Sequence, residues 1–373
     1  MEISLCMIVK DEEVTIKRCL LSVKDVVDEI IIVDTGSNDK TVEYAKSLGA
    51  KVYNFKWVDD FSKARNYSFS KATKDYIFWL DADDILKESD IDKFKELKLN
   101  LAKEDIDSVI MNYILEVNEY GEATFSLKRN RLVKRSNNFK WIGAVHEYLD
   151  VKGNIIQSDI NIIHKKEKKY TPRNLKIYEK MLADNKDFSP REIFYFANEL
   201  YDNLRYEEAI NYYKKFLSCK KNYLEDNIQA CSKISYCYAF LDDKINELKY
   251  ILKSFEYDIP RPDFCCRLGY KFLYENNYDA AIYWYTIAIN RAPKKNEMSL
   301  INHDTYTYLP WIQLCVCYSK KGDFNLAYFS NEMAAKYKPN DSYVIHNRNY
   351  LKDKVSKDII EKSKNKNVIH HGL

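Results

Sequence analysis

The sequence predicts an α/β domain with a mostly parallel sheet over residues 1–170. An all-α solenoid of helical repeats follows over residues 171–352, with a helical extension or tail over residues 353–373. Short apolar runs alternate with helical patterns up to about residue 160, which is typical of a sheet covered by helices on both faces. Beyond about residue 172 helix follows helix, and a repeat with a period near 34 residues recurs.

The α/β half opens with the strand ISLCMIV at residues 3–9 and a helix whose apolar residues recur at helical spacing. The strand EIIIVD at 29–34 precedes a helix in SNDKTVEYAKSLG, where Ser37 or Asn38 can cap the start and Gly49 can stop the end. The remaining strand-like runs are KVYNF at 51–55, DYIFWLD at 75–81, SVIMNYILEV at 108–117 and FSLKRNRLV at 125–133.

The helical half contains the repeat. RYEEAINYYKKFL (205–217), NYDAAIYWYTIAI (277–289) and DFNLAYFSNEMAA (323–335) share an aromatic residue followed three positions later by alanine. With the weaker copy KINELKYILKSF (244–255), the periods are 38, 34 and 46 residues. Pro after the second helix of a repeat completes a pattern that resembles the tetratricopeptide repeat, and a plain helical bundle with an aromatic core is the alternative.

The composition excludes several classes of protein. The net charge of +3 is too small to predict a nucleic-acid partner. Nine scattered cysteines form neither a disulfide framework nor a zinc motif. The first residues do not read as a signal or transit peptide, and no apolar run has the 18 or more residues of a membrane helix, so we expect a cytoplasmic protein without a transmembrane segment.

Acids follow two of the apolar strands. Asp34 ends EIIIVD and Asp81 ends YIFWLD, and ligands of parallel sheets bind at the carboxyl ends of the strands. Asp81-Ala82-Asp83 places two carboxylates one residue apart, which suits a hard divalent cation such as Mg²⁺ or Mn²⁺. Taken alone, this motif can equally be a solvated turn that caps the next helix.

Four motifs occur together in one order: IVKDEE, IIIVDTGSNDKT, WVDDFSKARNYS and IFWLDADDIL. In order and spacing they resemble the family 2 glycosyltransferases, which have the Rossmann-like GT-A fold. The resemblance covers about residues 3–165. With helical repeats behind it, the chain is similar to bacterial enzymes that join such a catalytic domain to tetratricopeptide repeats, among them the peptide S-glycosyltransferases of the bacteriocin (glycocin) type.

The resemblance implies a nucleotide-sugar site lined by Val9, Asp34, Arg65, Asp81, Ala82 and Asp83. Asp34 maps to the acid that binds uracil or ribose. The usual Asp-Asp-Gly-Ser reads Asp34-Thr35-Gly36-Ser37 here, which leaves open which acidic contact survives. Arg65 either binds phosphate or clamps an acid of the metal motif. Asp83 is the expected direct metal ligand, with Asp81 near the ribose or a metal-bound water.

The segment WIGAVHEYL, residues 141–149, supplies the remaining candidates. The resemblance implies that His146 completes the metal shell and that Glu147 is the general base. The two roles could be exchanged, and both residues could instead only fix a loop. Arg131 and Arg135 rank low as ligands of the diphosphate. His164, like the other histidines, lacks a partnered motif and is assigned to the surface or the core.

The resulting hypothesis is a metal-dependent, inverting glycosyltransferase that uses Mn²⁺ or Mg²⁺. It would move a hexose or N-acetylhexosamine from a donor such as UDP-glucose or UDP-N-acetylglucosamine to a peptide or protein side chain, a Ser/Thr hydroxyl or a Cys thiol. The repeats would bind the acceptor, and a homodimer is a further expectation. One alternative is the same chemistry on a cell-envelope glycan or lipid-linked sugar, and another is a non-catalytic tetratricopeptide scaffold.

Overall fold

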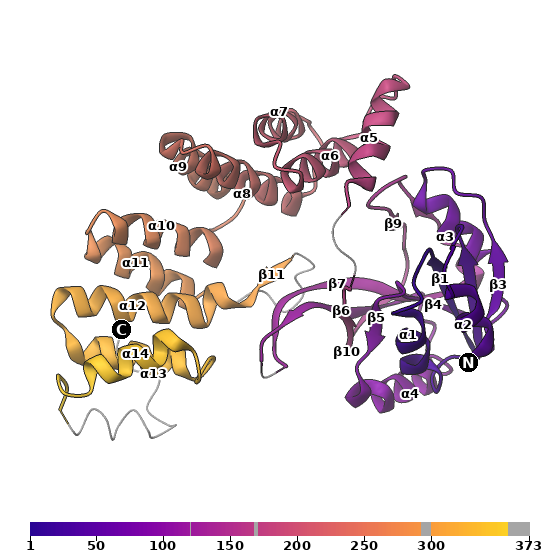
Figure 1. The fold of residues 1–373 in the computed structure, drawn as a ribbon, viewed down its shortest axis with the longest axis horizontal. Helices are drawn as coiled ribbons and strands as arrows, with labels where there is room; N and C mark the ends of the chain where they lie inside the picture. The colour runs from indigo at the N-terminus through magenta and orange to yellow at the C-terminus, as the bar shows by residue number, and fades with distance from the viewer. Residues whose placement is uncertain (120, 168–170, 292–299, 357–373) are drawn as a thin grey trace. The chain divides into compact units, whose positions relative to one another are not determined.

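The computed structural model describes residues 1–119, 121–167, 171–291 and 300–356 (Figure 1). Two compact units make up the chain. The N-terminal unit comprises Met1–Asp226 and Cys237–Asp242 with a short later segment, and the C-terminal unit comprises Asn227–Tyr236 and most of the chain from Asp243 onward. The boundary at residue 170 marks the change from strands to helices and stays a prediction.

Eight strands of the N-terminal unit lie in the sheet in the order β3-β2-β1-β4-β7-β6-β10-β5, and a further two-residue strand, β11 (Ile301–Asn302), occurs later in the chain. Four of the seven pairings are parallel, namely β2 with β3, β1 with β2, β1 with β4 and β6 with β10. This confirms the predicted α/β domain with a mostly parallel sheet. The strands are β1 (Ile3–Val9), β2 (Glu29–Asp34), β3 (Lys51–Asn54), β4 (Tyr76–Trp79), β5 (Asp84–Leu86), β6 (Ser108–Val117), β7 (Ala123–Lys134) and β10 (Ile155–His164).

Helices connect several of the strands. They are α1 (Ile16–Val23), α2 (Thr41–Ser47), α3 (Phe61–Phe69) and α4 (Ile91–Asn100). Almost every residue of β1 is buried, because apolar side chains cover both faces of this central strand. Helix α2 begins later than predicted: the Ser37 hydroxyl donates to Asp34 instead of capping the helix, whereas Gly49 ends it with φ +83°, as predicted.

The strand order positions the site. β1 lies between β2 and β4, so the chain leaves β1 toward one side of the sheet and later crosses to the other. In the parallel register Val9 at the end of β1 is opposite Asp34 at the end of β2, and β4 ends on the other side of β1 at Trp79. Such a switch in strand order is where α/β sheets bind ligands.

The chain after the sheet is helical, which confirms the predicted all-α region. Its helices are α5 (Arg173–Ala183), α6 (Pro190–Asp202), α7 (Tyr206–Leu217), α8 (Leu224–Phe240), α9 (Lys244–Lys253), α10 (Pro262–Tyr274), α11 (Tyr278–Ile289), α12 (Tyr308–Lys321), α13 (Phe324–Ala335) and α14 (Ser342–Leu351). Helix α6 packs on α7, α10 on α11 and α12 on α13. The three repeated alanines, Ala209, Ala281 and Ala327, are fully buried. The repeat type stays a prediction, and the predicted tail lies outside the described residues from position 357.

Across the described ranges, no helix has the length and apolar character needed to cross a membrane.

Candidate functional site

The loops that follow β1 and β2 are tied to each other. The Asp34 carboxylate accepts hydrogen bonds from the Ser37 hydroxyl at 2.5 Å and from the Gly36 and Ser37 amides at 3.2 Å. The Ser37 hydroxyl accepts the Asp11 amide hydrogen at 2.9 Å, and the Asp11 carboxylate accepts the Asn38 amide hydrogen at 2.7 Å. Gly36 adopts φ +108°, which favours glycine. Asp34 is therefore buried and orders the loop beside Val9, which is also buried.

Arg65 connects two of the predicted acids. It lies on α3, and its Nη2 donates to Asp81 at 2.7 Å while its Nε donates to Glu147 at 2.5 Å. Burial alone would lower the pKa of Arg65 and raise that of Asp81, but the attraction between the two charges dominates: it raises the pKa of Arg65 and holds that of Asp81 well below its usual range. Both groups are charged at neutral pH, so Arg65 clamps an acid of the Asp81-Ala82-Asp83 motif in this structure.

The aromatic surroundings of Arg65 fix its position. Its guanidinium lies 5.0 Å from the ring centre of Trp79 and 4.8 Å from that of Trp141. The next residue, Asn66, donates to the Trp141 carbonyl and accepts from the Trp141 amide, both at 2.9 Å. Trp141 begins the short strand β8 (Trp141–Ile142), which pairs with β9 (Tyr148–Leu149). The Arg65-Asn66 pair thus attaches the predicted 141–149 motif to the nucleotide side of the sheet.

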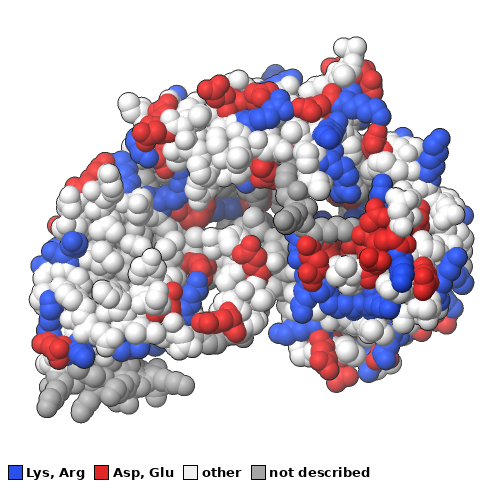
Figure 2. Space-filling view, viewed as in Figure 1, with Lys and Arg blue, Asp and Glu red and all other residues white. Residues whose placement is uncertain are grey.

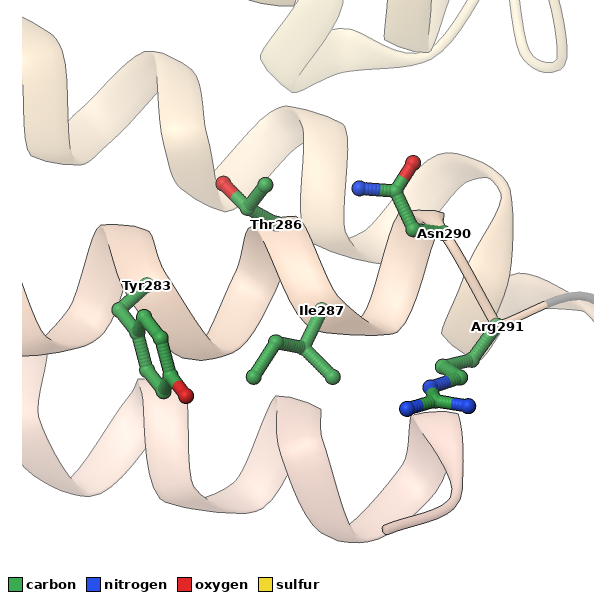
Figure 3. Close-up of a pocket in the computed structure, with 5 residues that line it drawn as sticks. All are labelled: Tyr283, Thr286, Ile287, Asn290 and Arg291. Atoms are coloured by element: carbon green, nitrogen blue, oxygen red, sulfur yellow. The ribbon is translucent and has the colours of Figure 1, made fainter. Parts of the chain in front are cut away.

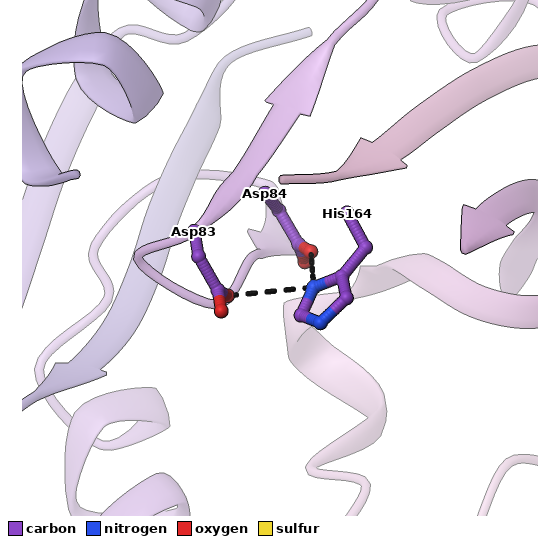
Figure 4. A group of neighbouring side chains, drawn as sticks. All are labelled: Asp83, Asp84 and His164. Carbon is purple, nitrogen blue, oxygen red and sulfur yellow. Dashed lines mark hydrogen bonds and ion pairs between the residues drawn. The ribbon is translucent and has the colours of Figure 1, made fainter. Parts of the chain in front are cut away.

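A cluster with the donors of a cation site lies at the end of β4 (Figure 4). Asp83, Asp84 and His164 bring two carboxylates and an imidazole together, with His164 Nδ1 3.5 Å from Asp83 Oδ1 and 3.3 Å from Asp84 Oδ1. Burial and the neighbouring acids raise the pKa of Asp83 to about 6. Burial alone would lower the pKa of His164, but the adjacent carboxylates raise it. A carboxylate that is costly to ionise among other acids fits a divalent cation.

The Asp84 carboxylate already has several partners within the protein. Its carboxylate is fully buried and lies 3.0 Å from Arg131 Nη2, and it accepts hydrogen bonds from the Tyr113 hydroxyl at 2.9 Å and the Asp81 amide at 3.1 Å. Arg131 is itself fully buried between the rings of Trp79 and Tyr113. It therefore stabilises Asp84 from within the protein and is not exposed to a ligand. Asp83 and His164 are both partly exposed, and His164 Nδ1 also lies 2.9 Å from the Tyr113 hydroxyl and 3.3 Å from Asp84 Oδ1. A cation bound by Asp83 and His164 would therefore replace these contacts of His164.

His146 and Glu147 point to different neighbours. Glu147 meets Arg65, whereas His146 Nε2 lies 2.7 Å from Glu199 Oε1 of helix α6. His146 adopts the left-handed conformation with φ +50°. Among the described residues, the group of side chains that could hold a cation contains His164, and the role of His146 as a metal ligand stays a prediction.

His164 and Glu199 contact the predicted residues Asp83 and His146, but neither was itself predicted as a site residue. His164 ends the apolar run of strand β10, the same signal that identified Asp81 after β4, and the antiparallel pairing of β10 with β5 brings His164 opposite Asp84. Glu199 lies within the amphipathic helix pattern PREIFYFANELYD and has no local signal. Ala82, which was predicted to line the nucleotide-sugar site, is buried, and its role there stays a prediction.

Charged side chains are unevenly distributed over the surface of the N-terminal unit. Figure 2 shows Asp and Glu side chains gathered on one face of the N-terminal unit, beside a band of Lys and Arg. An acidic edge repels a diphosphate unless a cation is bound. A separate hollow of about 500 Å³ in the C-terminal unit is lined by Tyr283, Thr286, Ile287, Asn290 and Arg291 of the α11 region (Figure 3). Those residues include no acid and no histidine, so this hollow is not a second copy of the site.

Known proteins resemble this chain in sequence. Residues 4–153 match the family described as Glycosyl transferase family 2. The chain is 38% identical over 149 residues to a TPR repeat-containing protein of Synechococcus elongatus, covering 40% of this chain and 36% of that protein. It is 30% identical over 268 residues to the SPbeta prophage-derived glycosyltransferase SunS of Bacillus subtilis, covering 68% and 62%. The chain thus spans less than two thirds of the length of either relative.

Two solved structures show weaker likeness. Staphylococcus aureus TarS 1–349 has 13% identity and a TM-score of 0.37, covering 67% of this chain and 90% of that one. Glucosyl-3-phosphoglycerate synthase of Mycobacterium tuberculosis, in complex with Mn²⁺ and UDP-glucose, has 16% identity and a TM-score of 0.35, covering 50% and 80%. The sequence match and the strand-end acids carry the assignment: the chain contains a glycosyl transferase family 2 domain over residues 4–153.

Proposed function

We propose that the protein is a metal-dependent, inverting glycosyltransferase that moves a hexose or N-acetylhexosamine from a UDP-sugar to a peptide or protein side chain. The observation that carries this proposal is the cluster of Asp83, Asp84 and His164 at the end of β4, together with the match of residues 4–153 to family 2. The uracil and ribose would lie over Val9, Asp34 and Ala82. Hydrogen bonds hold the loops after β1 and β2 together there.

Asp83 and His164 fit a cation, and Asp84 supports them from a fully buried position. A nitrogen ligand suits Mn²⁺ better than Mg²⁺, which prefers oxygen ligands throughout. When bound, the cation would neutralise charge on the diphosphate leaving group. Asp81, held by Arg65, would then face the donor as a fixed acceptor for ribose hydroxyls or metal-bound water.

The transfer needs a base on the side opposite the diphosphate. Glu147 and His146 are the candidates, and one of them would take the proton of the acceptor hydroxyl or thiol as that atom attacks C1. A single displacement inverts the configuration at C1 and requires no covalent nucleophile. Glu147 forms an ion pair with Arg65, so this contact would have to break before Glu147 accepts a proton. His146 contacts Glu199 through Nε2, and its Nδ1 would accept the proton instead.

The peptide or protein acceptor is supported by the resemblance to peptide S-glycosyltransferases and by the identity to the glycosyltransferase SunS over 268 residues. The helices after the domain, with their buried alanines at repeat positions, would bind that acceptor. The cytoplasmic location, the homodimer and the choice between oxygen and sulfur as acceptor atom remain predictions.

A donor screen tests this function. The purified protein is incubated with Mn²⁺ and, separately, each common nucleotide sugar, and release of the nucleoside diphosphate is measured with and without peptides that contain Ser, Thr or Cys. We expect turnover with one UDP-sugar, lost in Asp83→Asn and His164→Ala, and a product of inverted configuration by NMR. Absence of turnover with every donor, or full activity of both variants, contradicts the proposal.

A further inference from the structure

Glu199 is a buried carboxylate outside the family 2 domain. It lies on α6 and is 2% exposed. Its Oε1 is 2.7 Å from His146 Nε2 and accepts a hydrogen bond from Asn174 Nδ2 at 3.1 Å. A buried carboxylate is costly unless strong hydrogen bonds compensate it. The helical region therefore places a buried carboxyl group at the turn that precedes Glu147.

The same turn is held by further side chains of α5 and α6. The Tyr195 ring stacks on His146 with centres 4.4 Å apart and planes 17° apart. Arg191 Nη2 donates to the His146 carbonyl at 3.1 Å, and the Tyr178 hydroxyl donates to the Val145 carbonyl at 3.4 Å. The ring and the carbonyl of His146 are thus both fixed by residues that lie beyond position 153.

The backbone conformation of His146 shows why these contacts are important. Residues other than glycine adopt positive φ at an energetic cost, and His146 has φ +50°. The turn directs His146 toward Glu199, while the carboxylate of the next residue, Glu147, lies 2.5 Å from Arg65 Nε. Loss of the contact with Glu199 removes the strongest hydrogen bond of His146 and with it a reason for the turn to stay left-handed.

The contact also selects one form of the imidazole. An ionised Glu199 can only accept a hydrogen bond, so it would select the His146 ring with hydrogen on Nε2, and in the neutral ring the lone pair would then lie on Nδ1. A carboxylate that holds an imidazole in one tautomer, with the other nitrogen free to accept a proton, is the arrangement that makes histidine an effective base.

We propose that Glu199 is a positioning residue for glycosyl transfer, which fixes the tautomer of His146 and the turn that presents Glu147. This inference rests on the proposed function. It extends the catalytic machinery from the family 2 domain into helices α5 and α6, so the first helices after the sheet belong to the enzyme as well as to any acceptor-binding surface.

The test uses the full chain and five variants: Glu199→Gln, Glu199→Ala, His146→Ala, the His146→Ala/Glu199→Ala double variant, and Glu207→Gln as a matched control. Glu207 is an exposed acid on the next helix, α7, so its replacement removes the same charge without touching the turn. Turnover is measured with the active donor and acceptor, donor binding by calorimetry, and unfolding in urea.

Glu199→Ala is expected to lower kcat by at least about tenfold and toward the hundredfold that a misplacement of about 1 Å causes. The affinity for the nucleotide sugar should stay within about twofold, because His146 and Asn174, which contact Glu199, are not among the residues proposed to bind the nucleotide sugar. Glu199→Gln, which keeps an acceptor oxygen, should recover part of kcat, and the double variant should be no slower than His146→Ala alone. Normal kcat in Glu199→Ala, a change confined to KM, or losses that multiply in the double variant would overturn the proposal.

A spectroscopic measurement separates this inference from the proposed function. In protein with ¹⁵N-labelled histidine, the His146 signals, assigned with His146→Ala, should show hydrogen on Nε2, and this pattern should disappear in Glu199→Ala but persist in Glu207→Gln. An inactive wild type with this signature contradicts the proposed function alone. Hydrogen on Nδ1 only, or a signature unchanged in Glu199→Ala, contradicts the role of Glu199 whatever the activity.

Discussion

Replacing Arg131 by Met is expected to destabilise the N-terminal unit by about 3–5 kcal/mol, the range measured when one partner of a buried ion pair is removed. The Arg131 guanidinium and the Asp84 carboxylate are both 0% exposed and lie 3.0 Å apart. The rings of Trp79 and Tyr113 cover the guanidinium at 4.1 and 4.3 Å. Met has a similar length, so the main cost comes from the unpaired charge and less from a cavity.

The size of this destabilisation depends on the hydrogen bonds that Asp84 would retain in Arg131→Met. The Tyr113 hydroxyl at 2.9 Å and the Asp81 amide at 3.1 Å would still donate to it, each with a net value of about 1 kcal/mol. Two such hydrogen bonds do not offset a buried charge that has lost its partner. The Arg131→Met/Asp84→Asn double variant removes that charge and should therefore recover at least about half of the lost stability.

The assay is urea unfolding followed by tryptophan fluorescence, since the N-terminal unit contains Trp57, Trp79 and Trp141. Arg205→Met is the matched control: its guanidinium is 37% exposed and pairs with acids on the surface, so its loss should cost less than about 1 kcal/mol. The reasoning fails if Arg131→Met costs no more than this control, or if the double variant is as unstable as the single one.

Three other changes test different parts of the structure. Burial alone would raise the pKa of Glu29, but its hydrogen-bond donors lower it from 4.5 to about 2; at 1.36 kcal/mol per pH unit this gives about 3 kcal/mol of stability at pH 7. Because the folded pKa is the lower one, the advantage of wild type over Glu29→Gln in urea unfolding should be lost as pH falls from about 5 to 2, and an advantage that persists at pH 2 would contradict the assignment. Gly269→Ala should cost about 1–3 kcal/mol despite the higher helix propensity of Ala, because a Cβ would lie 2.7 Å from the buried Tyr285 ring; a stabilised variant in thermal unfolding would refute this close helix contact. Arg65→Lys keeps the charge but cannot bridge Asp81 and Glu147, so kcat/KM should fall at least about tenfold with little change in unfolding, and wild-type kinetics would show that the clamp is dispensable.

The strands and their terminal acids were predictable because their signal is local. An apolar run that ends in Asp34 or Asp81 reads as a buried strand leading to a ligand edge, and the sheet places both acids beside β1. Arg65 contacts Asp81, an acid of the metal motif, which was one of its two predicted roles, and phosphate binding by Arg65 stays a prediction.

The remaining parts of the site depend on contacts between distant segments. His164 reaches Asp83 only because β10 pairs with β5, a pairing that spans 80 positions between His164 and Asp84. Glu199 meets His146 across 53 positions through a helix whose pattern resembles any amphipathic helix. The start of α2 was misplaced because Ser37 has a stronger local partner in Asp34 than the helix terminus offers.

Calorimetric titration of UDP into the protein, with and without Mn²⁺, tests the central claim most directly. The titration compares wild type with Asp83→Ala and with Asp92→Ala, an acid whose side chain is 96% exposed on α4. The account predicts UDP binding that requires Mn²⁺, is lost in Asp83→Ala and is unchanged in Asp92→Ala. Equal UDP binding with and without Mn²⁺, or equal binding by wild type and Asp83→Ala, would contradict a cation-dependent nucleotide-sugar site at the end of β4.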